Sequence, residues 1–172
     1  MSQGTVIVNS CSKGNLDFPA LFPVISVLSC AQTRTVSHKR NKIAALSEPF
    51  KGLDLDARYL GYFACFNQKR FFEAHEVLED LWLADRHGPD GAFYKGLIQL
   101  AGAFVHLEKQ RPSPAAALLR LTLANLKKYS AVHHRLNLAE LNLQIERLLQ
   151  ELGQGRLVSS SVAPPLNLEE NS

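Results

Sequence analysis

The chain has 172 residues, of which 46% are hydrophobic and 20% are charged, a composition typical of one soluble domain with tails. The apolar stretch at 18–31 is shorter than the roughly 18 residues of a spanning helix and contains two prolines, so no membrane partner is expected. The net charge is +3, but the first 47 residues hold five basic residues and one acidic residue and so carry more positive charge than the whole chain. The near-neutral remainder is therefore not expected to bind nucleic acid.

Residues 1–50 are predicted to form an irregular leader, because they lack the helical period of the later sequence. The three cysteines, Cys11, Cys30 and Cys65, cannot build a disulfide framework, which favours a reducing, cytoplasmic location. Residues 27–30 weakly resemble a bacterial lipoprotein cleavage box, and the basic start weakly resembles an organelle-targeting peptide. The prolines of the leader and its few early basic residues argue against both forms of targeting.

From residue 53 onward, apolar residues recur every three or four positions, which predicts helices at about 54–66, 71–86, 90–109, 114–129 and 138–152. Asp54 is the expected cap of the first helix, and Pro112 and Pro114 mark the start of the fourth. The short connections are typical of antiparallel helix pairs. We therefore predict an all-α bundle of about five antiparallel helices with irregular N- and C-terminal tails, divided into a leader at 1–50, a helical domain at 51–155 and a tail at 156–172.

The second predicted helix carries the polar residues of most interest. On a helical wheel with Phe71 at zero, His75, Glu79 and Trp82 lie at about 40°, 80° and 20°, so they share the face that is directed at or beside the core. His75 and Glu79 are one turn apart and can meet each other or one ion. The opposite side is expected to face solvent and carries Glu73, Glu76 and Asp80.

The pattern from His75 to Glu79 differs from the His-Glu-x-x-His helix of zinc proteases, because a glutamate stands where the second histidine ligand would be. A His–Glu pair can still supply two metal ligands, and a catalytic zinc ion would need a third protein ligand and a water. His106, on the third predicted helix, is the candidate for that third ligand.

The third predicted helix has a narrow stripe formed by Lys95, Gln99, Gly102 and His106. Two interpretations stay open: the stripe is the solvated edge of a buried helix, or Gln99 and His106 face His75 and Glu79 across the helix pair. The adjacent pair at 133–134 is interpreted as surface histidines, because neighbouring positions of a helix cannot both face one ion.

The sequences at 66–82 and 93–101 resemble the domain of unknown function 309 family, whose signature is a His-x-x-x-Glu-x-x-Trp helix followed by an aromatic-Tyr-x-Gly-Leu-Ile-Gln helix with a histidine near its end. The resemblance covers roughly 55–130 and implies a small all-helical fold, labelled a predicted metal-dependent hydrolase without an established substrate. Lys69 stands where the family usually has glycine, and the residues at 111–114 replace its Gly-Asn turn. By this resemblance, the shared cluster comprises His75, Glu79, Trp82, Gln99 and His106.

Three functions remain open for this cluster. The first is a non-catalytic interaction or structural module, with a protein partner or a second copy of the chain. The second is a metal-dependent hydrolase with zinc or magnesium, in which His75, Glu79 and His106 are the ligands and catalytic groups, and Lys95, Gln99 and Trp82 bind substrate. The third is small-ligand binding between the second and third helices. The sequence offers no nucleophile elbow or phosphate loop.

Overall fold

The computed structural model describes residues 41–156 and 158–169. The lipoprotein and targeting interpretations fall on residues 1–40 and lie outside the described residues. Within the described ranges, the helices are α2 (Ala57–Asn67), α3 (Phe71–Ala84), α4 (Gly91–Glu108), α5 (Pro112–Leu126) and α6 (Leu138–Gly153). The short elements are η1 (Glu48–Phe50), β1 (Val132–His133), β2 (Leu136–Asn137) and η2 (Ser160–Val162).

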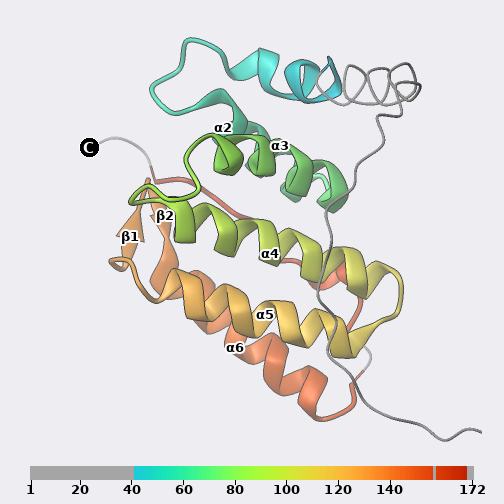
Figure 1. Ribbon diagram of the computed structural model, residues 1–172. Coiled ribbons are helices and arrows are strands. Elements are labelled where there is room, and N and C mark those ends of the chain that lie inside the picture. The colour runs from blue at the N-terminus through green and yellow to red at the C-terminus, as the bar shows by residue number, and fades with distance from the viewer. Residues whose placement is uncertain (1–40, 157, 170–172) are drawn as a thin grey trace, which may run out of the picture.

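Each helix packs on the next one in the sequence, so that α2 to α6 follow one another down the molecule in Figure 1. The predicted all-α architecture is confirmed, with one addition. Strands β1 and β2 form a two-stranded antiparallel hairpin between α5 and α6, where no strand was expected. No helix of the described ranges combines the length and the apolar character that crossing a bilayer requires.

The helix ends follow local capping chemistry. Helix α2 begins at Ala57, because the carboxylate of Asp56 accepts a hydrogen bond from the backbone N–H of Arg58 at 2.8 Å, so the expectation that Asp54 caps it is wrong. Helix α5 begins at Pro112, earlier than expected, since proline at the first position of a helix loses no hydrogen bond.

Aromatic side chains from α2, α3 and α4 make the centre of the core. The rings of Phe66, Phe71 and Phe104 pack with centroids 5.1–5.5 Å apart. The fully buried Tyr62 donates its hydroxyl to the backbone carbonyl of Leu97 at 2.9 Å, which ties α2 to α4 and satisfies the only polar atom of that side chain. Cys65 is buried in this core, as expected, and its burial raises the pKa of the thiol.

The end of the expected leader packs onto the helical body. Residues 41–47 are helical, Ile43 is buried, and Nζ of Lys42 lies 3.5 Å from Glu73 and 3.7 Å from Glu76. The side chain of Glu76 is only 14% exposed. The part of α3 that carries Glu73 and Glu76 was expected to face solvent and is instead covered by residues 41–47, whereas the side chain of Asp80 is 45% exposed, as expected.

The tail after α6 is irregular, as predicted, yet its described residues are packed. Leu166 is buried, and its backbone exchanges two hydrogen bonds with the side chain of Asn67, at 2.8 and 2.9 Å. Leu168 pairs with Leu136 of β2. These contacts hold the tail across the hairpin and the end of α2.

We expect Asp56→Ala to lower the free energy of unfolding by about 1 kcal/mol at neutral pH, the usual cost of a lost helix cap. The hydrogen bond from the Arg58 side chain lowers the pKa of Asp56 more than burial raises it. The stabilisation is therefore complete above the unfolded pKa of about 3.9 and is lost as the pH falls through the folded pKa. Chemical unfolding of both proteins across acidic pH measures this difference.

The control is Asp56→Asn, because asparagine caps a helix without a titrating charge, and it should retain most of the stability at every pH. An equal loss for Asp56→Ala at pH 3 and pH 7 would show that the carboxylate is not the stabilising group.

Candidate functional site

The sequence motif forms one partly exposed face, which we call the motif face: His75, Glu79 and Trp82 of α3 with Lys95, Gln99, Gly102 and His106 of α4. Nε2 of His75 lies 3.9 Å from Oε1 of Glu79, and these side chains are 35% and 33% exposed. The pair therefore meets, as its spacing predicts, but it lies at the rim of the core and not inside it.

The α4 stripe lies between α3 and α5. Oε1 of Gln99 accepts a hydrogen bond from Nδ2 of Asn125 on α5 at 2.9 Å, so Gln99 is paired away from α3. A Cβ atom on Gly102 would lie 3.3 Å from Cδ1 of Leu118 and 3.9 Å from Nδ1 of His75. The glycine therefore allows α3 and α5 side chains to approach the same point of α4.

Two ring nitrogens on the motif face are buried without a hydrogen-bond partner among the described residues: Nε1 of Trp82 and Nδ1 of His106. Nζ of Lys95 lies 6.0 Å from the centroid of the Trp82 ring, at the outer limit of a cation–π contact. A buried polar nitrogen without a partner is costly, so these two atoms are candidates for contact with a group outside the described residues.

The structure does not gather His75, Glu79 and His106 as one ligand set. Among the described residues, one group of three His, Cys, Asp or Glu side chains has its ligand atoms within 4.8 Å of one another, and that group is Asp90, His133 and His134. The assignment of His75, Glu79 and His106 as metal ligands and catalytic groups stays a prediction.

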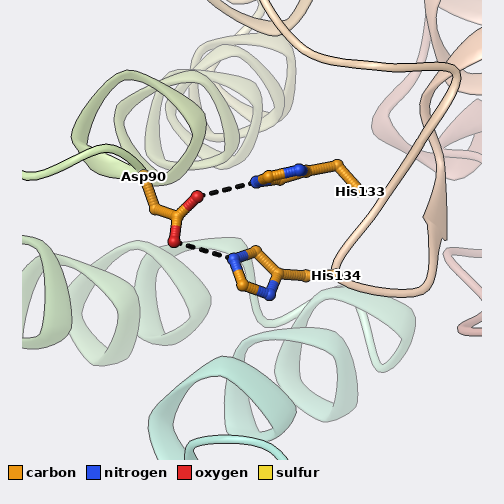
Figure 2. A group of neighbouring side chains, drawn as sticks. All are labelled: Asp90, His133 and His134. Carbon is orange, nitrogen blue, oxygen red and sulfur yellow. Dashed lines mark hydrogen bonds and ion pairs between the residues drawn. The ribbon is translucent and has the colours of Figure 1, made fainter.

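The second group lies where the hairpin meets the start of α4, and Figure 2 shows both histidine rings directed at one carboxylate. Nε2 of His133 is hydrogen-bonded to Oδ1 of Asp90 at 2.7 Å, and Nε2 of His134 lies 2.9 Å from Oδ2. The three side chains are 24%, 32% and 29% exposed in the order His133, His134 and Asp90. They are thus enclosed on most sides and still reachable from solvent.

The hairpin turn explains how two adjacent histidines face one point. His134 and Arg135 form a two-residue turn in which both residues have positive φ, 45° and 63°, as the type I′ geometry requires. Such a conformation is strained for residues other than glycine. Two hydrogen bonds hold the turn in this conformation. The Tyr59 hydroxyl donates to the His134 carbonyl at 3.1 Å, and the backbone N–H of Glu169 donates to the Arg135 carbonyl at 2.7 Å.

Asp90 precedes α4 as its cap residue, yet its side chain makes no capping hydrogen bond and turns to the histidines. The Tyr129 hydroxyl holds this segment, since it donates to the Pro89 carbonyl at 2.8 Å and accepts from the Phe93 N–H at 2.9 Å. Burial raises the pKa of Asp90, but the neighbouring imidazoles of His134 and His133 outweigh this effect, and the pKa is lowered. The carboxyl is therefore held as a carboxylate.

Sequence reasoning missed this group because it placed the two histidines on a surface next to a helix. The available signal was weak: a hairpin of two-residue strands has no alternation to read, and the turn lacks glycine. The contact with Asp90 joins positions 43 residues apart, which no local spacing reveals.

Residues 59–118 match the model of the family described as Domain of unknown function (DUF309). The family predicted from the motif is therefore confirmed over those residues. The chain is also 33% identical, over 93 residues, to the Uncharacterized protein YpuF of Bacillus subtilis (strain 168). The match covers 54% of this chain and 51% of that relative, so the chain spans about half the length of the curated relative it matches. No solved structure matches the chain significantly.

The matched range separates the two groups of residues. All residues of the motif face lie within 59–118, and so does Asp90. His133 and His134 lie outside it. The second group therefore joins the matched segment to the part of the chain that follows it.

We expect Tyr129→Phe to destabilise the protein by about 1–2 kcal/mol, because two hydrogen bonds to the segment that carries Asp90 are lost. Equilibrium unfolding in urea measures the change. Tyr94→Phe is the matched control: it removes a hydroxyl from a ring that stacks on His134 without a hydrogen bond, and it should stay within about 0.5 kcal/mol of the parent. Equal effects of the two variants would contradict the role of Tyr129.

Proposed function

We propose that the chain is a non-catalytic helical interaction module, in which the motif residues fix the packing of α3 on α4 and offer the motif face to a protein partner. The observation that carries this proposal is that His75 and Glu79 meet at the rim of the core, one-third exposed, with no third ligand side chain gathered around them in the described structure. A zinc site needs at least three protein ligands and this pair offers two, so it suits recognition of a partner better than metal chemistry.

The chemistry of the surrounding surface supports a protein segment as the partner. Phe72 and Leu83 are both 55% exposed on α3, on the side next to Glu79. They lie eleven residues apart in sequence, about 16 Å along the helix axis, which matches the length of three turns of a partner helix. Trp82, an aromatic residue type that often anchors interfaces, lies in the same stretch of the helix.

The metal-dependent hydrolase is the second candidate, favoured by the His75–Glu79 contact and by the unpartnered Nδ1 of His106. In that function His75, Glu79 and His106 would bind zinc or magnesium, and Lys95, Gln99 and Trp82 would bind substrate. The hydrogen bond of Gln99 with Asn125 counts against the substrate role, because the amide oxygen is already occupied.

The third candidate, a small ligand between α3 and α4, has less support. A pocket of about 370 Å³ lies between the α4–α5 turn and the segment after α6, and none of its lining residues belongs to the motif face.

We place the module in the reducing cytoplasm, in line with the buried thiol of Cys65.

The metal content of His75→Gln distinguishes the first two candidates. We expect the purified variant to hold the same metal per chain as the parent and to lose at most about 1 kcal/mol of stability, because the His75–Glu79 pair is partly exposed. Mass spectrometric metal analysis and thermal unfolding give the two readouts. His87→Gln, the same change on an exposed histidine, is the control. A selective loss of bound metal from His75→Gln would favour the hydrolase.

The motif face is tested by a photo-crosslinking residue placed at Leu83 and, as a matched control, at Leu143 of α6, which is equally exposed at 55%. We expect a discrete covalent adduct in cells from position 83 and none from position 143. The adduct should weaken when His75 and Glu79 are both changed to glutamine. The mass of the adduct identifies the partner. A second copy of the chain would give an adduct with twice the mass of the chain. Equal adducts from both positions would contradict the proposal.

A further inference from the structure

We infer that Asp90, His133 and His134 form a binding site for one divalent transition-metal ion, with zinc the best fit. This site is separate from the motif face and does not depend on the function proposed for it. It joins the first turn of α4 to the histidine hairpin, by which we mean β1, its turn and β2 (Figure 2).

The donor set has the composition of an open zinc site. Two imidazole nitrogens and one carboxylate oxygen supply three protein ligands, which leaves at least one position for water or another anion. Magnesium and calcium prefer all-oxygen sites, so the two imidazoles favour zinc or a neighbouring transition metal.

The distances agree with an ion after a small adjustment. The ligand atoms of the three side chains all lie within 4.8 Å of one another. Ligands bound tetrahedrally at about 2.0–2.1 Å are roughly 3.3 Å apart. The separations from the two carboxylate oxygens of Asp90 are 2.7 Å to His133 and 2.9 Å to His134, so each ring must move away from its oxygen by about half an ångström to admit an ion.

The contact of His134 adds a detail to this geometry. Its Nε2 atom is buried and lies 2.9 Å from Oδ2 of Asp90 in an ion-pair contact, but this contact lacks hydrogen-bond geometry, and the atom has no hydrogen-bond partner among the described residues. A buried imidazole nitrogen without a hydrogen-bond partner is destabilising. An ion between the ring and the carboxylate would supply that partner.

The backbone holds the ligands in place beforehand. The strained turn at His134 and Arg135 is fixed by Tyr59 and by Glu169, and Arg135 also forms an ion pair with Asp54. The Phe93 and Tyr129 rings pack against His133, with centroids 4.8 and 4.6 Å from the imidazole. Ligands restrained in this way lose little conformational freedom on binding, which favours affinity.

An alternative is that the three side chains form only a hydrogen-bonded contact that fastens the hairpin to α4. Both accounts make Asp90 and the histidines important for stability. They differ in whether the folded protein takes up one ion per chain, so the test measures uptake directly.

The experiment uses the full chain, freed of metal with a chelator and titrated with Zn²⁺ against a competing chelator of known affinity. We expect one Zn²⁺ per chain, and a higher melting temperature in its presence. We expect weaker Zn²⁺ binding from each of three variants, His133→Gln, His134→Asn and Asp90→Asn. Changing a residue that only hydrogen-bonds a metal ligand typically weakens binding by roughly 10- to 100-fold, and each of these variants, which lose a ligand itself, should weaken it by more. Asparagine is chosen at position 134 because it tolerates positive φ.

His75→Gln is the control and should bind Zn²⁺ as the parent does, which separates this site from the motif face. Circular dichroism of each metal-free variant shows whether it is folded, and the visible spectrum of the Co²⁺-loaded parent reports the coordination geometry. The inference is overturned if the folded parent takes up no Zn²⁺, or if Asp90→Asn and His133→Gln bind it as tightly as the parent. In either case the three residues form a hydrogen-bonded contact only.

Discussion

The burial of α4 is the constraint on which the rest of the structure depends. This helix packs against α3 on one side and α5 on the other. Its backbone also accepts side-chain hydrogen bonds from α2 and α5: Tyr62 donates to the Leu97 carbonyl at 2.9 Å, and Thr122 donates to the Gly96 carbonyl at 3.3 Å. A Cβ atom on Gly96 would lie 2.9 Å from Cδ2 of Leu126, so α5 can approach this closely only because the residue is glycine. With α4 fixed in this way, its partly exposed stripe and its first turn have defined surroundings.

Those two parts of α4 support different chemistry. At the start of α4, Asp90 faces the histidine hairpin (Figure 2). The last turns of the helix carry His106, a residue of the motif face. The two residues are 16 positions apart, or about 24 Å along the helix axis, so no single ion can use both. A hydrolase site at the motif face would therefore leave the metal-ligating residues at the hairpin unexplained. An ion at the hairpin would in turn leave the motif face available for a protein partner. The two proposals stand or fall separately.

The sequence was sufficient to predict the positions of the helices, but it did not predict which segments pack over their polar sides. The regular apolar spacing and the Gly/Pro breaks placed all five helices of the predicted bundle, and the His75–Glu79 spacing correctly indicated a contact. Two features depended on tertiary contacts that no local pattern contains. Glu73 and Glu76, on the polar side of α3, are covered because Lys42 and the residues around it pack there. The histidines meet Asp90 because a short hairpin with an unusual turn returns to the start of α4. Helical periodicity shows which face of one helix is apolar, but it does not show what a distant segment places on the other face.

The two proposals place a metal ion at Asp90, His133 and His134 and none at the motif face. Anomalous diffraction at the zinc edge, from crystals of the full chain grown with Zn²⁺, tests both together. We expect one strong anomalous peak bonded to Asp90, His133 and His134, at bond lengths of about 2.0–2.2 Å. A peak bonded to His75 and Glu79, with none at the hairpin, would contradict both.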